Sequence, residues 1–215
     1  MKKIAIIANT SSGRETAAQQ AFLARSAIWG WPCEFYFPQS VAEFHDLCVR
    51  ITADQYEALI TIGGDGTVNR VLQSHANLQH AAPLYPFPGG TANDLAHELG
   101  LSADWDEVQN LLDRKQHDWM DILDVNGMRF STVGGIGVGS IFTQEFNQKR
   151  QQSAVYRTLA QFFHYQFYTL LSAKTILLKN NYMHHLRIRG SGFDEKIRTP
   201  AVFFCNQAYI GGNVK

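Results

Sequence analysis

A glycine-rich turn that carries a carboxylate is the first segment in which chemistry is expected. Residues 63–69 are Gly-Gly-Asp-Gly-Thr-Val-Asn and follow an apolar run. Closely spaced glycines permit positive φ angles and bring backbone N–H groups near a ligand, and the start of a helix adds partial positive charge that suits phosphate. Asp65 would repel bare phosphate, so it indicates a Mg²⁺ ion or a hydroxyl beside it. The alternative is a structural turn in which Asp65 caps a helix.

A second glycine turn lies at residues 88–94, Pro-Gly-Gly-Thr-Ala-Asn-Asp. Alone, Thr91 and Asp94 would indicate only a helix N-cap and an acidic residue in the first helical turn. A third carboxylate, Asp121, begins another apolar segment, and the three aspartates are spaced by the length of a strand and a helix. Loops that follow parallel strands gather at the carboxyl edge of an open sheet. We therefore expect Asp65 and Asp94 to face one crevice, with Asp121 near it at a domain boundary.

Other candidate motifs are weaker or missing. The loop after the first apolar run contains Asn9 and three hydroxyl residues, which suits either contacts to a nucleotide or a turn that faces solvent. The glycines at residues 134–139 lack the spacing of a dinucleotide site. The sequence has no Gly-Lys dipeptide, which excludes a Walker-type P-loop. The absence of an H-E-x-x-H motif excludes the zinc-protease helix that carries it, and the absence of G-x-S-x-G excludes the nucleophile elbow of serine hydrolases.

The elements that must position these turns alternate in the first half of the chain. Continuous apolar runs indicate strands buried on both faces of a parallel sheet, and segments with helical spacing lie between them. The predicted strands are residues 3–8, 33–37, 58–62 and 83–87, and the predicted helices are residues 16–29, 42–50, 66–72 and 92–99. This order predicts right-handed crossovers and an open parallel α/β sheet.

After residue 120 the pattern becomes that of short antiparallel strands with one helical insertion. The predicted strands are residues 121–125, 129–133, 174–178, 184–189 and 196–205. The insertion, residues 153–171, carries an aromatic stripe that either faces a core or forms an apolar wall for acyl chains or a membrane. We therefore expect two domains, at residues 1–121 and 122–215.

Composition supports an ordered protein of the cytoplasm. The 215 residues are 45% hydrophobic and 18% charged, which excludes intrinsic disorder. The cysteines, Cys33, Cys48 and Cys205, are odd in number and lack C-x-x-C spacing, as in a reduced protein. No apolar run reaches the roughly 18 residues of a membrane span.

Charge is divided unequally along a chain whose net charge is zero. Residues 1–121 carry 8 Lys and Arg against 15 Asp and Glu, whereas residues 122–215 carry 11 against 4. This indicates either two ordinary surfaces or a basic half that approaches an anionic partner such as a lipid headgroup surface. Candidates for that contact are Lys149, Arg150 and Arg157.

Taken together, the motifs resemble one known family. GGDGTVN at 63–69, GTAND at 90–94 and the Met-Asp-Ile segment at 120–122 resemble the diacylglycerol kinase catalytic domain of bacterial lipid kinases, which are related to sphingosine and ceramide kinases. The loop after the first strand and NQAYIGG at 206–212 also fit. NAD kinases share the first turn but have Asn-Glu at the second, so the second turn favours the lipid branch.

The resemblance implies an NAD-kinase-like open parallel α/β domain that binds ATP, at 1–121, and a partial antiparallel β-sandwich substrate domain, at 122–215. It implies ATP-dependent phosphorylation of a hydroxyl on a membrane lipid such as diacylglycerol, with Mg²⁺ as cofactor. Catalysis and water-mediated Mg²⁺ binding would involve Asp65, Asp94 and Asp121. The implied nucleotide-binding residues are Asn9, Ser40, Gly63, Gly64, Asp65, Gly66, Thr67, Val68, Asn69 and Thr91.

The expected partner is a lipid substrate at an anionic membrane surface. The protein is expected to be cytoplasmic, to associate with the membrane peripherally and to bind no nucleic acid. A homodimer is compatible with the pattern.

Two departures from the family stand out. Only Ser40 supplies the hydroxyl that often follows the second strand, and the family's later segment with its proposed general base lies beyond Lys215. The alternatives are a catalytically incomplete nucleotide-binding remnant and a small-molecule kinase of the NAD type.

Overall fold

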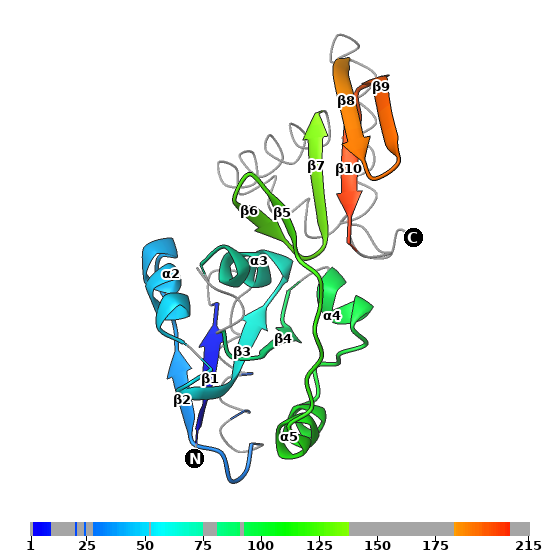
Figure 1. The fold of residues 1–215 in the computed structure, drawn as a ribbon. Helices are drawn as coiled ribbons and strands as arrows, with labels where there is room; N and C mark the ends of the chain where they lie inside the picture. The colour runs from blue at the N-terminus through cyan, green and yellow to red at the C-terminus, as the bar shows by residue number, and fades with distance from the viewer. Residues whose placement is uncertain are drawn as a thin grey trace, which may run out of the picture. The chain divides into compact units, whose positions relative to one another are not determined.

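Four parallel strands form a sheet in the N-terminal part of the chain (Figure 1). The strands are β1 (Lys3–Ala8), β2 (Cys33–Tyr36), β3 (Tyr56–Gly63) and β4 (Leu84–Pro88), in the order β2-β1-β3-β4. The structure is a computed structural model that describes residues 2–9, 20, 24, 28–51, 53–74, 81–90, 93–137 and 183–206. The predicted strands are confirmed to within a few residues, because a run that is apolar on both faces fits only a covered sheet.

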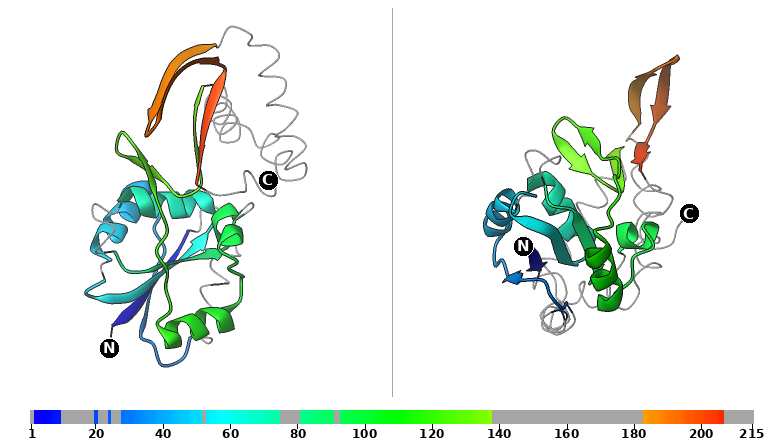
Figure 2. Two further views of the ribbon diagram at one scale, coloured as in Figure 1. Left: turned by 45° about the vertical axis from the view of Figure 1, so that its right-hand side comes forward. Right: turned by 60° about the horizontal axis from the view of Figure 1, so that its bottom comes forward.

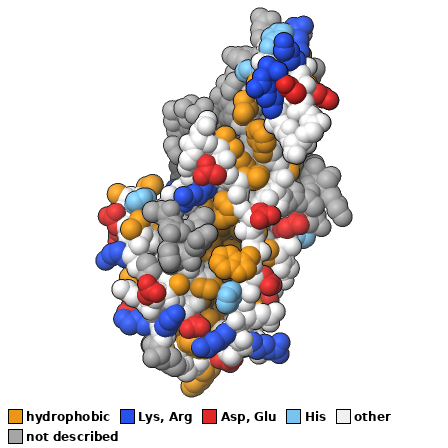
Figure 3. Space-filling model, in the orientation of Figure 1, with side chains coloured by type: hydrophobic (Ala, Val, Ile, Leu, Met, Phe, Trp, Pro, Cys, Tyr) orange, Lys and Arg blue, Asp and Glu red, His pale blue; other side chains and the backbone are white. Residues whose placement is uncertain are grey.

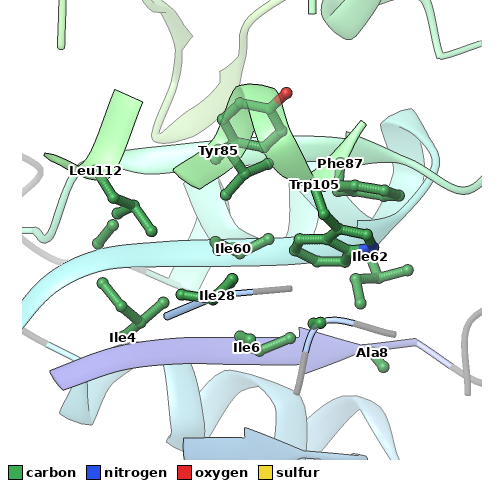
Figure 4. Packing of buried hydrophobic residues seen from close by; sticks show 13 residues of the cluster. Ile4, Ile6, Ala8, Ile28, Ile60, Ile62, Tyr85, Phe87, Trp105 and Leu112 are labelled. Carbon is green, nitrogen blue, oxygen red and sulfur yellow. The ribbon is translucent and has the colours of Figure 1, made fainter. Parts of the chain in front are cut away.

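Helices cover both faces of this sheet (Figures 1 and 2). On one face, α2 (Val41–Arg50) and α3 (Asp65–Ser74) pack Phe44, Leu47 and Val71 against Ala5, Ile7 and Leu59. On the other face, α5 (Trp105–Arg114) packs against the alternate strand residues (Figure 4). Its Trp105 stacks on Phe87 of β4, with ring centroids 4.2 Å apart.

Two helices differ from the sequence expectation. α4 is a short helix (Asp94–Glu98), whereas residues 92–99 were expected to be helical. α5 was not predicted, although Asp104 caps it by accepting a hydrogen bond from Asp106 N, at 2.9 Å. Apolar residues at helical spacing, Trp105, Val108 and Leu112, were the signal that could have revealed it.

The later strands form antiparallel pairs. β5 (Leu123–Val125) pairs with β6 (Met128–Phe130) around Asn126 and Gly127, and β7 (Val133–Gly137) pairs with β10 (Ala201–Cys205). β8 (His184–Gly190) pairs with β9 (Phe193–Thr199). Predicted strand 196–205 is in fact two strands that meet at Pro200, which has no N–H for a ladder. Predicted strand 129–133 is likewise divided, at Ser131 and Thr132.

These observations confirm the fold class, a parallel α/β sheet with antiparallel strands towards the C-terminus. Contacts divide the chain into two compact units, one within Met1–Thr132 together with Asn206, the other Val133–Cys205. The domain assignment 1–121 and 122–215 stays a prediction. The expected helix 153–171, the expected strand 174–178 and nearly all of the expected helix 16–29 lie outside the described residues. Of the helices that the structure describes, none has the length and apolar character needed to cross a membrane.

A hydrogen-bonded cluster ties β1, β2 and β3 together. The Glu34 carboxylate forms an ion pair with Lys3 and accepts hydrogen bonds from the hydroxyls of Tyr36 and Tyr56, each at 2.7 Å. The hydrogen bond from Lys3, followed by those from Tyr56 and Tyr36, lowers the pKa of the Glu34 carboxyl to about 2. Ionised Glu34 therefore stabilises the fold.

We expect Glu34→Gln to lower the free energy of unfolding at pH 7 by about 1 kcal/mol, a value reduced for the partial exposure of the carboxylate. Because the folded pKa lies below the unfolded one, the contribution of Glu34 is complete above about pH 4.5 and is lost as the pH falls towards 2. Urea unfolding across this range should show the variant and wild type converging at low pH, whereas Glu98→Gln should have no effect. A difference that does not change with pH would contradict the role of the ionised group.

Candidate functional site

The two glycine turns contact each other at the carboxyl edge of the sheet. Gly63 ends β3 and Pro88 ends β4, and Gly89 N donates a hydrogen bond to Gly63 O at 2.9 Å. A Cβ atom built on Gly90 would lie 2.4 Å from the Cα atom of Gly64. The turns meet at a distance that only glycine permits.

The expectation of positive φ angles in the first turn is wrong. Gly63, Gly64 and Gly66 do not occupy the left-handed region, which the structure assigns to other glycines such as Gly100 and Gly127. Close backbone approach is the reason for glycine at position 64, because its neighbour is the backbone of the second turn.

Asp65 connects the first turn to the helix that follows the second. Its Oδ2 atom accepts a hydrogen bond from Asp94 N, and its Oδ1 atom accepts one from Leu95 N, both at 3.1 Å. Asn93, the N-cap residue of α4, makes no side-chain cap of its own, because its amide group is bonded to the backbone of Gly90. The structure thus brings Asp65 and Asp94 together. The sequence analysis considered Asp65 as a cap of the helix that follows the first turn, whereas in the structure its carboxylate caps α4.

Asn9 connects the end of β1 to the first turn of α3. Its Nδ2 atom donates a hydrogen bond to Thr67 Oγ1 at 3.0 Å, and its backbone N–H donates to Ile62 O at 3.1 Å. Asn9 and Thr67 are both buried. Two of the predicted nucleotide-binding residues are therefore in contact although they are far apart in the sequence.

A hollow of about 170 Å³ lies beside this contact. Ser40 lines it and caps α2 by accepting a hydrogen bond from Glu43 N at 3.1 Å, which leaves its O–H available as a donor. Arg70, which the sequence analysis did not identify, also lines the hollow and is exposed. Among the described residues no carboxylate forms an ion pair with Arg70. Its position three residues after Thr67, on the same helical face, was the available signal. The full lining is Asn9, Pro38, Gln39, Ser40, Val41, Phe44 and Arg70.

The remaining predicted site residues are placed differently. Val68 is buried in the core and its backbone N–H donates a hydrogen bond to Gly64 O, whereas Gly66 and Asn69 are exposed. Asp121 is exposed, and its backbone oxygen accepts a hydrogen bond from Asn206 Nδ2 at 2.7 Å. Thr91 lies outside the described residues.

The carboxylate of Asp65 is able to contribute to a Mg²⁺ site. Carboxylate oxygens are the ligands that Mg²⁺ prefers, and each oxygen of Asp65 keeps a lone pair after accepting one amide hydrogen. Within the part of the chain that the structure describes, no three acidic, histidine or cysteine side chains are grouped closely enough to hold a metal ion. A water-mediated site on Asp65, Asp94 and Asp121 stays a prediction.

A comparison with known proteins covers the parallel sheet and both glycine turns. Residues 3–125, more than half of the chain, match the family model of the diacylglycerol kinase catalytic domain. The chain belongs to the diacylglycerol kinase catalytic domain family. Both glycine turns and all four strands of the parallel sheet lie inside the matched region of this family domain.

Relatives of this diacylglycerol kinase family member include a protein named diacylglycerol kinase from Bacillus subtilis. It is 29% identical over 144 residues, which are 64% of this chain and 46% of the relative. Another so named, from Staphylococcus saprophyticus, is 27% identical over 145 residues, which are 66% of this chain and 47% of the relative. The chain thus spans about half the length of the relatives it matches.

A fold similar to that of this family member occurs in a crystal structure of another protein. A crystal structure described as a diacylglycerol kinase from Bacillus anthracis superimposes with a TM-score of 0.70 at 21% identity, and the match covers 98% of this chain and 66% of that one. At this identity the likeness shows the fold alone.

Proposed function

We propose that this chain binds ATP at the two joined glycine turns and transfers its γ-phosphoryl group to a hydroxyl of a membrane lipid such as diacylglycerol. The observation that carries the proposal is the contact between the turns. In this contact, the Asp65 carboxylate accepts hydrogen bonds from the first two backbone N–H groups of α4. Phosphoryl transfer depends mainly on positioning and on neutralising charge. A pair of turns fixed to each other at a sheet edge supports that chemistry.

The nucleotide would span from the first turn to the hollow. Backbone amides at the start of α3 and the positive end of its dipole suit the phosphates, near Gly64 and Gly66. The hollow of about 170 Å³ is smaller than the roughly 300–1,000 Å³ of sites that enclose a whole ligand, so it would hold only one end of ATP. Ser40 and Arg70 would bind that end.

Mg²⁺ would be held through water by Asp65, Asp94 and Asp121, and when bound it would neutralise charge on the phosphates. The lipid substrate would be met at an anionic membrane surface by a peripheral, cytoplasmic protein. A homodimer is compatible with this proposal.

Incubation of the chain with Mg²⁺, γ-labelled ATP and a mixed lipid extract tests the function. Label in the lipid fraction is the expected result, and its mobility names the lipid class. ATP binding without transfer would instead support a nucleotide-binding protein that lacks part of the catalytic apparatus. In a parallel reaction that contains NAD in place of lipid, label on NAD would indicate a kinase of the NAD type and would overturn the lipid assignment.

The nucleotide half of the proposal is tested by Arg70→Gln. A hydrogen bond to a charged group contributes about 1.5–3 kcal/mol, so we expect ATP to bind roughly tenfold or more weakly to the variant. Calorimetry with adenosine should show no change if the guanidinium contacts phosphate. Arg50→Gln, on an exposed arginine at the end of α2, is the matched control. Equal ATP affinity in the Arg70 variant would remove Arg70 from the site.

A further inference from the structure

One face of the β8–β9 hairpin is basic. Along β8, exposed side chains alternate with half-buried ones, as expected when a strand has two different faces, whereas β9 alternates only from Lys196 to Thr199. In Figure 3, blue and pale-blue side chains gather where Figure 1 labels β8 and β9. The exposed face carries His185, Arg187, Arg189, Asp194, Lys196 and Arg198.

The strand register places two like charges directly opposite each other. Arg187 is paired with Lys196. Like charges in directly opposite positions destabilise an antiparallel pair. The arrangement therefore lowers the stability of the hairpin, and an anionic partner would relieve the repulsion.

A single carboxylate compensates part of this charge. Asp194 accepts hydrogen bonds from Arg187, with Nε to Oδ1 at 2.6 Å, and lies within 3.5 Å of Arg189 Nε. Across the described residues, no carboxylate forms an ion pair with Lys196 or Arg198. With His185 neutral, the four Lys and Arg side chains and one Asp leave the face with a formal charge of +3.

The shape of the hairpin suits a phosphate-bearing surface. A shallow hollow of about 320 Å³ is lined by residues of both strands, His185, Arg187, Lys196 and Arg198 among them. At the turn, Phe193 is 50% exposed, but its pairing with Gly190 puts it on the face opposite the basic side chains.

We propose that this face of the β8–β9 hairpin docks on the anionic phosphate headgroups of a membrane. The inference rests on the proposed function, because a lipid substrate places the partner surface in a bilayer. It also gives the basic half of the sequence a specific location. The earlier candidates Lys149, Arg150 and Arg157 lie outside the described residues. Nucleic acid is the competing polyanion, and the lipid substrate of the proposed function favours the membrane.

The test is sedimentation of the whole chain with vesicles of equal parts phosphatidylglycerol and phosphatidylcholine, compared with pure phosphatidylcholine. The variant is Lys196→Gln with Arg198→Gln, which leaves the Arg187–Asp194 pair intact. Each basic side chain near such a surface strengthens binding roughly fivefold, about 1 kcal/mol, so the variant should bind about thirtyfold more weakly. Binding of wild type should weaken as salt is raised, because the Debye length shortens.

Arg50→Gln with Arg114→Gln is the matched control, because it removes the same charge from exposed arginines at the ends of α2 and α5. This control should sediment like wild type. Unchanged sedimentation of the hairpin variant, or tighter binding of wild type to a DNA duplex than to the anionic vesicles, would overturn the docking surface. Calorimetry with Mg²⁺ and ATP separates this outcome from failure of the kinase proposal. A chain that binds anionic vesicles through the hairpin but binds no ATP would refute the proposed function and support the surface.

Discussion

Asparagine at position 65 is expected to reduce ATP-dependent phosphoryl transfer by about a hundredfold or more in a protein that still folds. The Asp65 carboxylate accepts two hydrogen bonds from backbone N–H groups, one on each oxygen. The side chain of Asn has one oxygen and an NH₂ group, so one N–H of α4 would face a donor instead of an acceptor. The start of α4 would then shift relative to the first glycine turn. Asp65 acts here as a positioning residue, whether or not it also binds Mg²⁺ through water.

The measurement is turnover of labelled ATP alongside the melting temperature of Asp65→Asn. Asp104→Asn is a matched control, because Asp104 caps α5 through a single hydrogen bond to Asp106 N, and Asn caps a helix as well as Asp does. That control should keep both turnover and stability. Wild-type turnover in Asp65→Asn would contradict the role of the turn in catalysis.

A methyl group at position 90 is expected to separate the two turns. In Gly90→Ala, the new Cβ atom would lie 2.4 Å from Gly64 Cα and 2.9 Å from Gly64 N. These are backbone atoms that cannot rotate away, so the loss of stability should lie near the upper end of the roughly 1–3 kcal/mol that overpacking costs. For a chain of this length, 3 kcal/mol corresponds to a fall in melting temperature of about 6–12 °C. Calorimetric unfolding measures it, and ATP affinity should fall as well.

Gly66→Ala supplies the matched control inside the first turn. A Cβ atom on Gly66 meets no other atom within 4 Å, and the residue lies in α3. Alanine is favoured over glycine in a helix by about 0.5–1 kcal/mol, so this variant should be as stable as wild type or slightly more stable. If Gly90→Ala melted like Gly66→Ala, the close contact between the turns would be wrong.

Local patterns were sufficient to predict the sheet and the location of the turns. The apolar runs of β1 and β3 fit a strand covered on both faces, and glycines at the ends of β3 and β4 placed the site at the carboxyl edge. The contacts within the site could not be predicted in the same way. The hydrogen bonds from Asp94 and Leu95 to Asp65 depend on β3 and β4 being neighbours, which is set by the strand order of the whole sheet.

The same limit explains the role of the glycines and of Arg70. Glycine at position 64 suggests an unusual φ angle when only the local sequence is considered, whereas the structure requires it because Gly90 lies against it. Arg70 is an ordinary exposed helical residue until α3 is placed beside the loop that contains Ser40. The need for glycine at position 64 and the place of Arg70 in the hollow both depend on contacts with segments that are distant in the sequence.

The joined turns also constrain how this sequence can change over evolutionary time. Gly64 and Gly90 lie against each other, so that a side chain on either would contact the backbone of the other. The Asp65 carboxylate accepts hydrogen bonds from backbone N–H groups that follow the second turn. A side chain gained in one turn would need a compensating displacement in the other before selection could retain it. Substitutions at these positions should therefore be inherited in pairs, so the two motifs would persist together or be lost together in descendants of this chain.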